Sequence, residues 1–320
     1  MFAPRAEGLT SSAGEDLGWG TSNEEEGPVS HVSLRHPIRF GIYTQQEHRS
    51  WAEMVEIWQA AEEAGFEQAW LYDHFFPEEG DETGSCFESW TLLSALATQT
   101  RRIGIGVLVS GVTYRQPAIL AKQAVTVDHI SGGRLSLGLG TAWREPEHRA
   151  YGIDLPRPGI RVDRVGEALE LMRRLETEER ATFEGTYYRL EDAPFGPKPV
   201  HGHIPVCVAA LRPRMLGLVA RYADQWDTWG GTEAIAANGP IVDRLAIEAG
   251  RDPLAIRRSI CTGYEPLETL ETQVEHLDRY AASGVDTFIY NMAMERPVTA
   301  IVEVGRRLPG LREQYAAGSA

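Results

Sequence analysis

The sequence predicts a single α/β domain folded as a (β/α)8 TIM barrel, and two observations support that prediction. Eight runs typical of β-strands recur from residue 38 onward, and segments with helical periodicity separate them. Regular alternation of strands and helices is typical of parallel α/β folds, and eight such units over about 250 residues indicate a closed barrel. An open doubly wound sheet is the alternative.

The strand-like runs define the expected frame of the barrel. In chain order they cover residues 38–43, 66–72, 103–109, 134–140, 204–210, 224–230, 257–264 and 285–291.

The segments between these runs predict amphipathic helices. One helix is expected to begin at Pro117 and to stop at Gly132 and Gly133, because proline suits a first turn and glycine an end. Another is expected over residues 160–177. The earliest helix is expected between the first two strands, with an apolar stripe formed by Trp51, Met54, Val55, Trp58 and Ala61.

Three segments fall outside the regular alternation. Residues 1–35 lack an apolar stretch and predict a disordered tail, which leaves residues 36–320 as one domain. Residues 141–159 form an insertion after strand four, and residues 178–203 form an insertion before strand five in which TFEGTYYRL predicts a hairpin. Long insertions that follow barrel strands lie on the catalytic face.

The composition points to a small-molecule partner. With 46 acidic and 31 basic residues, the chain has a formal charge of -15, which disfavours nucleic acid and anionic lipid. The sequence contains no run of about 18 apolar residues, so no membrane span is predicted. The three cysteines show no paired spacing, which suits a reducing cytoplasm.

Small residues alternate along strands three and four. Gly104 and Gly106 share one face of their strand, as do Ser136, Gly138 and Gly140 of theirs. If these faces line the barrel interior, either they leave the lumen open for a flat ligand, or they make room for large side chains from other strands. Both explanations stay open.

Asp73 and His74, in LYDHFFP, follow the second strand at its carboxyl end, where barrel active sites lie. Histidine titrates near neutrality and suits acid–base work. The alternative is that Asp73 caps the next helix and His74 is a hydrogen-bonded strand-end residue. His201 and His203 precede strand five, on the opposite side of the barrel, and predict no metal site.

Several ordered blocks resemble the luciferase-like monooxygenase superfamily, and most of all its branch that uses the deazaflavin coenzyme F420. The blocks are LYDHFFP, the run from FESWTLLSALATQTRR through SGGRLSLGLG, AWREPEHRAYGI, RVDRVGEALELMRRL, TFEGTYYRL, PKPV and ARYADQW. The resemblance implies a barrel that binds a flavin-like ring at the carboxyl ends of its strands, with F420 as cofactor and FMN as the alternative. It also implies a homodimer.

The resemblance assigns roles to individual positions. His74 would lie against the reactive face of the ring as the proton donor or acceptor, with Asp73 orienting it. A cis peptide bulge behind the ring is expected near Val107–Leu108, with Leu108 and Ser110 as ring contacts. The remaining cofactor-binding candidates are Gly140, Thr141, Ala142, Trp143, Arg144, Glu147, Arg161, Ala209, Ala210, Leu211, Arg212 and Arg214.

Two of these regions depart from the family pattern. The family often has Gly-Trp-Asn-Glu where this chain has Ala142, Trp143, Arg144 and Glu145, so a long cation replaces a short neutral group. Arg212 replaces an expected glycine at the helix start after strand five. Arg212 and Arg214 would attract an anionic cofactor tail, and Arg161 would hold Glu147 or a phosphate; solvated helix-start arginines are the alternative.

The function expected from these observations is an F420-dependent oxidoreductase that moves a hydride between the reduced deazaflavin and a small organic substrate. An FMN-dependent monooxygenase keeps the same fold. A metal-dependent barrel hydrolase built on Asp73 and His74, and a cofactor-binding protein without catalysis, are alternatives from other classes.

Overall fold

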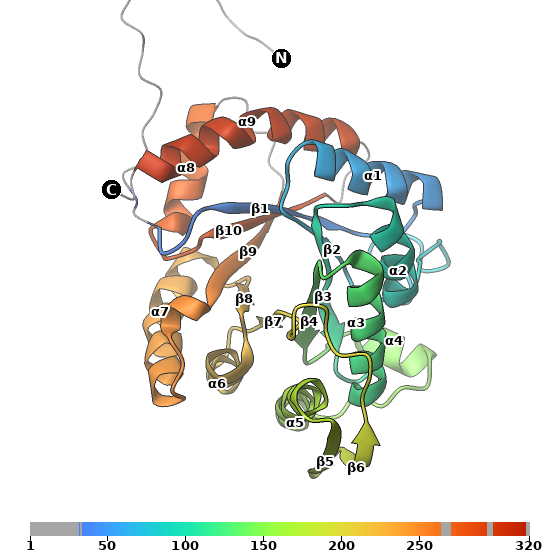
Figure 1. Cartoon of the computed structure of the whole chain (residues 1–320). Helices are drawn as coiled ribbons and strands as arrows, with labels where there is room; N and C mark the ends of the chain where they lie inside the picture. Colours follow the sequence, from blue (N-terminus) through green and yellow to red (C-terminus); the bar gives the residue numbers. More distant parts are fainter. Residues whose placement is uncertain (1–31, 33, 264–269, 293–296, 318–320) are drawn as a thin grey trace, which may run out of the picture.

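A closed barrel of eight parallel strands forms the body of the protein (Figure 1). The computed structural model describes residues 32, 34–263, 270–292 and 297–317. The strands neighbour one another in the order β1-β10-β9-β8-β7-β4-β3-β2, and β1 pairs with both β2 and β10. Because the sheet closes on itself, the barrel prediction is confirmed and the open doubly wound sheet is excluded.

Every barrel strand coincides with a strand-like run of the sequence. The strands are β1 (Arg39–Thr44), β2 (Gln68–Leu71), β3 (Gly104–Gly111), β4 (Leu135–Gly140), β7 (Val206–Ala209), β8 (Gln225–Thr228), β9 (Arg257–Gly263) and β10 (Thr287–Asn291).

Helices surround the barrel and cover the outward faces of the strands (Figure 1). They are α1 (Trp51–Glu63), α2 (Ser89–Gln99), α3 (Pro117–Ser131), α4 (Glu145–Ala150), α5 (Pro158–Thr177), α6 (Pro213–Tyr222), α7 (Gly231–Glu248), α8 (Leu270–Ala281) and α9 (Pro297–Ala317), with a short 3-10 turn at Pro253–Ala255. Within the described residues, no helix is both long and apolar enough to cross a membrane.

Local signals in the sequence set the helix ends. Ser50 and Glu53 form a capping box at the start of α1, and α3 ends at Gly132 in the left-handed conformation, with φ of 69°. The expected stripe of α1 needs one correction. Met54 and Trp58 are buried, but Trp51 opens the helix on its outer side and is 41% exposed.

Both insertions contain secondary structure. The segment after β4 holds α4, and the segment before β7 holds the antiparallel hairpin β5 (Arg180–Glu184) and β6 (Arg189–Pro194), which lies beside α5 (Figure 1). Most of the predicted tail, residues 1–31, lies outside the described residues. Its last residues contact the barrel: Leu34 packs on the core, and Arg35 Nη1 lies 2.9 Å from Asp243 Oδ1.

The small residues of β3 and β4 accommodate neighbouring chain atoms. A Cβ atom on Gly106 would lie 2.3 Å from the ring of Trp70, which points from β2 into the lumen. On β4, a Cβ atom on Gly138 would lie 2.0 Å from the Val107 carbonyl oxygen, and one on Gly140 would lie 2.5 Å from a methyl group of Val109. The open-lumen explanation is therefore wrong at Gly106 and Gly138, where the Trp70 ring and the Val107 carbonyl fill the space, whereas Gly140 at the strand end lines an open cavity.

Candidate active site

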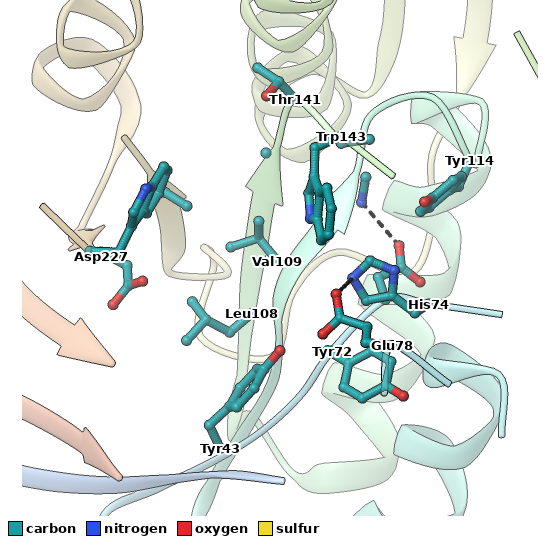
Figure 2. Close-up of a pocket in the computed structure, with 16 residues that line it drawn as sticks. Tyr43, Tyr72, His74, Glu78, Leu108, Val109, Tyr114, Thr141, Trp143 and Asp227 are labelled. Atoms are coloured by element: carbon teal, nitrogen blue, oxygen red, sulfur yellow. Dashed lines mark hydrogen bonds and ion pairs between the residues drawn. The ribbon is translucent and has the colours of Figure 1, made fainter. Parts of the chain in front are cut away.

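A cavity of about 520 Å³ opens above this filled layer, at the carboxyl ends of the strands (Figure 2). Eight of the predicted site residues line it: Asp73, His74, Leu108, Gly140, Thr141, Ala142, Trp143 and Ala209. The wall is completed by Tyr43, Tyr72, Glu78, Val109, Gly111, Tyr114, Asp227 and Trp229.

An irregularity in β3 forms the floor of the cavity. The peptide bond between Leu108 and Val109 is cis, one residue beyond the expected position, and the pairing of β3 with β4 shifts register between Val107 and Ser110. As a result, Leu108 and Val109 both line the cavity. The expected contact of Ser110 is corrected: past the shift its hydroxyl faces α2 and accepts a hydrogen bond from Trp90 Nε1 at 3.1 Å. Val107 is buried in the outer core.

His74 lies on the cavity wall between two carboxylates. Its Nδ1 atom is 2.8 Å from Glu147 Oε2. Its Nε2 atom is 3.2 Å from Glu78 Oε1 (Figure 2). The exposed ring of Trp143 meets the imidazole edge to face, with the ring centres 5.9 Å apart. The imidazole is therefore fixed in orientation while it faces the cavity.

Glu147 is fully buried beneath His74. Although burial opposes its charge, hydrogen bonds from His74, Tyr114 and the Phe75 amide hold the pKa of Glu147 below its usual range. The Tyr114 hydroxyl and the Phe75 N–H donate to it at 2.7 and 2.6 Å. An ionised carboxylate only accepts hydrogen bonds, so His74 carries a proton on Nδ1, and Nε2 is the nitrogen left for proton exchange. Glu147 does not line the cavity, so in place of the expected cofactor contact it holds His74 from behind.

Asp73 does not orient His74, which corrects the expected role. Its two carboxylate oxygens receive hydrogen bonds from Arg115 at 2.6 and 2.9 Å, from Ser89 Oγ at 2.7 Å and from the Gly111 amide at 3.0 Å. Asp73 therefore ties β2 to α2 and to the end of β3. The helix-cap alternative is also wrong, because Glu88 caps α2.

Arg144 points away from the cavity. Its guanidinium donates to the carbonyl oxygens of Phe76 and Pro77 at 2.9 and 2.7 Å and lies over the Phe76 ring. The arginine that replaces the family's asparagine thus holds the loop after β2 in place of a ring contact.

The residues at the end of β7 and just after it have different surroundings. Ala209 lines the cavity, whereas Ala210 is buried and its carbonyl accepts from Trp226 Nε1 at 2.8 Å. The carbonyl of Leu211 accepts from the Asn238 side chain at 3.3 Å. Arg212 is exposed at the start of α6, where no side chain caps the helix.

The starts of α5 and α6 meet beside the cavity. Arg161 of α5 donates to the backbone carbonyl of Ala142, which has φ of 55°, and lies 3.4 Å from that of Thr141; it does not contact Glu147. Arg214 of α6 donates to Asp163 and lies 3.3 Å from the Gly159 carbonyl. Within the described chain, the buried Nε atoms of Arg161 and Arg164 have no hydrogen-bond partner. Arg161 and Arg214 therefore put two cations at this junction.

Several cavity residues escaped the sequence prediction. Tyr43 lies one residue before the end of β1, Asp227 belongs to β8 and Trp229 follows β8. Their place at the carboxyl ends of predicted strands was the signal that could have found them. Glu78 and Tyr114 lie in the loops after β2 and β3, where sequence periodicity does not predict which way a side chain points.

The loop before β7 lies at the opposite end of the barrel. His203 bridges Glu176 and Asp224, at 3.0 and 2.9 Å, and these two hydrogen bonds raise the pKa of His203 to about 10. In the ranges that the structure describes, no group of three or more His, Cys, Asp or Glu side chains is arranged to hold a metal ion.

Known proteins resemble this chain over most of the barrel. A sequence profile of luciferase-like monooxygenases matches residues 31–300. An F420-dependent glucose-6-phosphate dehydrogenase of Intrasporangium calvum is 41% identical over 190 residues, which are 58% of this chain and only 55% of that protein. A protein of the same name from Segniliparus rotundus is 35% identical over 246 residues, covering 72% of this chain and 70% of the relative.

The fold is shared with solved structures. An F420-dependent secondary alcohol dehydrogenase, solved with an F420-acetone adduct, superposes with a TM-score of 0.76 at 19% identity and covers 86% of this chain and 99% of its own. Because the family profile spans far more than half of the sequence, this chain belongs to the luciferase-like monooxygenase family.

Proposed function

We propose that this protein is an F420-dependent oxidoreductase that acts on a small organic substrate. The observation that carries the proposal is His74, fixed by Glu147 through Nδ1 and facing a cavity of about 520 Å³ beside the β3 irregularity. The names of the Intrasporangium and Segniliparus relatives support F420 as the cofactor.

The residues present suit such a cofactor. Leu108, Val109 and Trp143 give the cavity the apolar and aromatic surface that a flat ring system requires. Next to it, Arg161 donates to the Ala142 carbonyl of the cavity wall and has an unpartnered Nε atom, so its cation suits the anionic tail. When bound, the deazaflavin would supply the hydride donor or acceptor.

The chain's own residues would orient the reactants and move a proton. Glu147 would keep the Nδ1 proton of His74 in place, so that Nε2 exchanges the proton that accompanies hydride transfer. Glu78 Oε1 contacts Nε2, and burial raises the pKa of Glu78, so this carboxyl would pass the proton onward toward the cavity mouth.

The cofactor assignment is tested by titrating the purified protein with F420 and with FMN while following tryptophan fluorescence. Trp143 and Trp229 line the cavity and report binding directly. We expect tight quenching by F420 only. Preference for FMN would overturn the cofactor assignment and favour the monooxygenase alternative.

We also propose a homodimer in the cytoplasm. The family resemblance supports the dimer, and the three free cysteines support a reducing compartment. Light scattering coupled to gel filtration measures the first, and fractionation of the source cells measures the second.

A further inference from the structure

Besides His74 and Glu78, the cavity holds a further group able to carry a proton, Asp227, on the wall opposite His74 (Figure 2). Asp227 belongs to β8 and is 5% exposed. The one hydrogen bond to its carboxyl group in the described structure comes from Ser259 Oγ to Oδ1, at 2.8 Å. Because Asp227 lines the cavity, its Oδ2 atom remains available to a bound molecule.

A chain of hydrogen bonds inside the barrel fixes which oxygen of Asp227 carries the proton. It starts at Trp70, whose indole N–H is only a donor and lies 3.2 Å from Gln68 Oε1. Gln68 must then present its amide NH2 group to Gln225 Oε1, at 3.0 Å. Gln225 in turn donates to Ser259 Oγ, at 3.0 Å.

The hydroxyl of Ser259 is left with one proton to donate. The Asp227 Oδ1 atom lies 2.8 Å away, closer than the Trp226 carbonyl oxygen at 3.4 Å. Oδ1 is therefore an acceptor, and a proton on Asp227 resides on Oδ2, the oxygen available to the cavity. The donor-to-acceptor direction of these hydrogen bonds is thus set by Trp70 and is passed through Gln68, Gln225 and Ser259 to the active site.

The surroundings of Asp227 suit a protonated, neutral carboxyl group. None of the residues that line the cavity in the described part of the chain is a lysine or an arginine. Burial raises the pKa of Asp227 to about 7, while the Ser259 hydrogen bond lowers it, so both protonation states are populated near neutral pH. Tyr43, Cys207 and Cys261 face it from β1, β7 and β9, and burial raises the pKa of each, which keeps all three neutral.

We infer that Asp227 Oδ2 is a second catalytic acid–base group, which exchanges a proton with the hydroxyl or carbonyl oxygen of a neutral alcohol or ketone substrate. The inference rests on the proposed function and deepens it by naming the substrate class. In alcohol oxidation, the carbinol C–H bond would break and its hydrogen leave as hydride, with two electrons, to the cofactor. The O–H bond would break to give Asp227 its proton as the C=O bond forms, while His74 Nε2 would exchange the separate proton that accompanies the hydride on the cofactor side. Ketone reduction would reverse each transfer.

The inference is tested first by infrared titration of the cofactor-free protein. The C=O stretch of a protonated carboxylic acid should titrate with a midpoint near pH 7 and vanish in Asp227→Asn. Asp192→Asn, on the exposed β5-β6 hairpin, is the matched control and should keep the band. Ser259→Ala should move the midpoint upward, because it removes the hydrogen bond that stabilises the ionised form.

Acetone, the smallest ketone, then probes whether Oδ2 meets a substrate oxygen. Adding it to the cofactor-free protein below pH 6 should lower the frequency of the Asp227 band, because Oδ2–H would donate to the ketone, and should change nothing in Asp227→Asn. Absence of the titrating band, its survival in Asp227→Asn, or its indifference to acetone would each overturn the inference. Since neither measurement uses F420, a failure of the cofactor assignment would be seen separately, in the fluorescence titration.

Discussion

The Nδ1 atom of His74 lies 2.8 Å from Oε2 of Glu147, a residue 73 positions later in the chain. This contact joins the loop after β2 to α4, in the insertion after β4, and it sets the tautomer of the imidazole. Glu147 therefore takes the orienting role that the family resemblance assigned to Asp73.

Replacement of His74 by alanine should separate chemistry from binding. We expect F420 affinity within a few-fold of the wild type but turnover lowered by roughly 10²-fold or more, the usual scale for a lost acid–base group. Fluorescence titration and steady-state rates measure the two effects. An unchanged rate would remove His74 from the mechanism.

Glu147→Gln should reduce both stability and activity. The amide keeps one oxygen, so its NH2 group would face either the Phe75 N–H or the donors from Tyr114 and His74, and buried donors would be unpaired at a cost of about 1–3 kcal/mol. Chemical denaturation measures the loss. Glu145→Gln, exposed on the same helix, is the matched control and should behave as wild type.

The same residue predicts how stability depends on pH. The pKa of Glu147 is depressed in the folded protein, so its stabilising contribution is complete above the ordinary glutamate value of 4.5 and is lost as pH falls through the lower folded value. The difference in unfolding free energy between wild type and Glu147→Gln should therefore shrink at acid pH. A constant difference from pH 7 to pH 3 would contradict this account.

Asp73→Asn should act on stability more than on proton transfer. It leaves the buried guanidinium of Arg115 short of its main counter-charge, and breaking such a pair costs about 3–5 kcal/mol. Arg115 retains Glu88, which places the expected loss toward the lower end. The pH profile of turnover, measured where the variant is folded, should keep its shape; a displaced profile would restore the direct link between Asp73 and His74.

Gly106→Ala should destabilise the barrel by about 1–3 kcal/mol, the usual cost of overpacking. Its new methyl group would collide with the Trp70 ring, since the Cβ position lies 2.3 Å from a ring carbon. Gly217→Ala in α6 is the control: its Cβ would meet no atom within 4 Å, and alanine favours the helix. Urea denaturation should show opposite signs for the two substitutions.

Arg161→Ala should weaken F420 binding and reduce its salt dependence. A charge-assisted hydrogen bond to an anionic tail contributes about 1.5–3 kcal/mol, which corresponds to roughly tenfold or more in affinity. Arg189→Ala, exposed on the β5-β6 hairpin, should leave both quantities unchanged. Equal salt slopes in wild type and Arg161→Ala would argue that Arg161 serves only the Thr141 and Ala142 carbonyls.

The sequence by itself determined the barrel, the positions of its strands and the edge at which the cavity opens. These follow from local periodicity and from the rule that loops at the carboxyl ends of parallel strands meet. His74 could be found because it follows β2 closely, and Trp143 because it follows β4 closely.

Only the tertiary structure decided which side chains face one another. The register shift in β3 turned Ser110 toward Trp90 and brought Val109 into the cavity, which simple alternation along a strand does not predict. It also paired Asp73 with Arg115 and gave Glu147 to His74, because contacts between residues far apart in sequence depend on how packed elements meet in space. The line of hydrogen bonds from Trp70 to Asp227 has the same origin: its members come from β2, β8 and β9, and only closure of the barrel makes them neighbours.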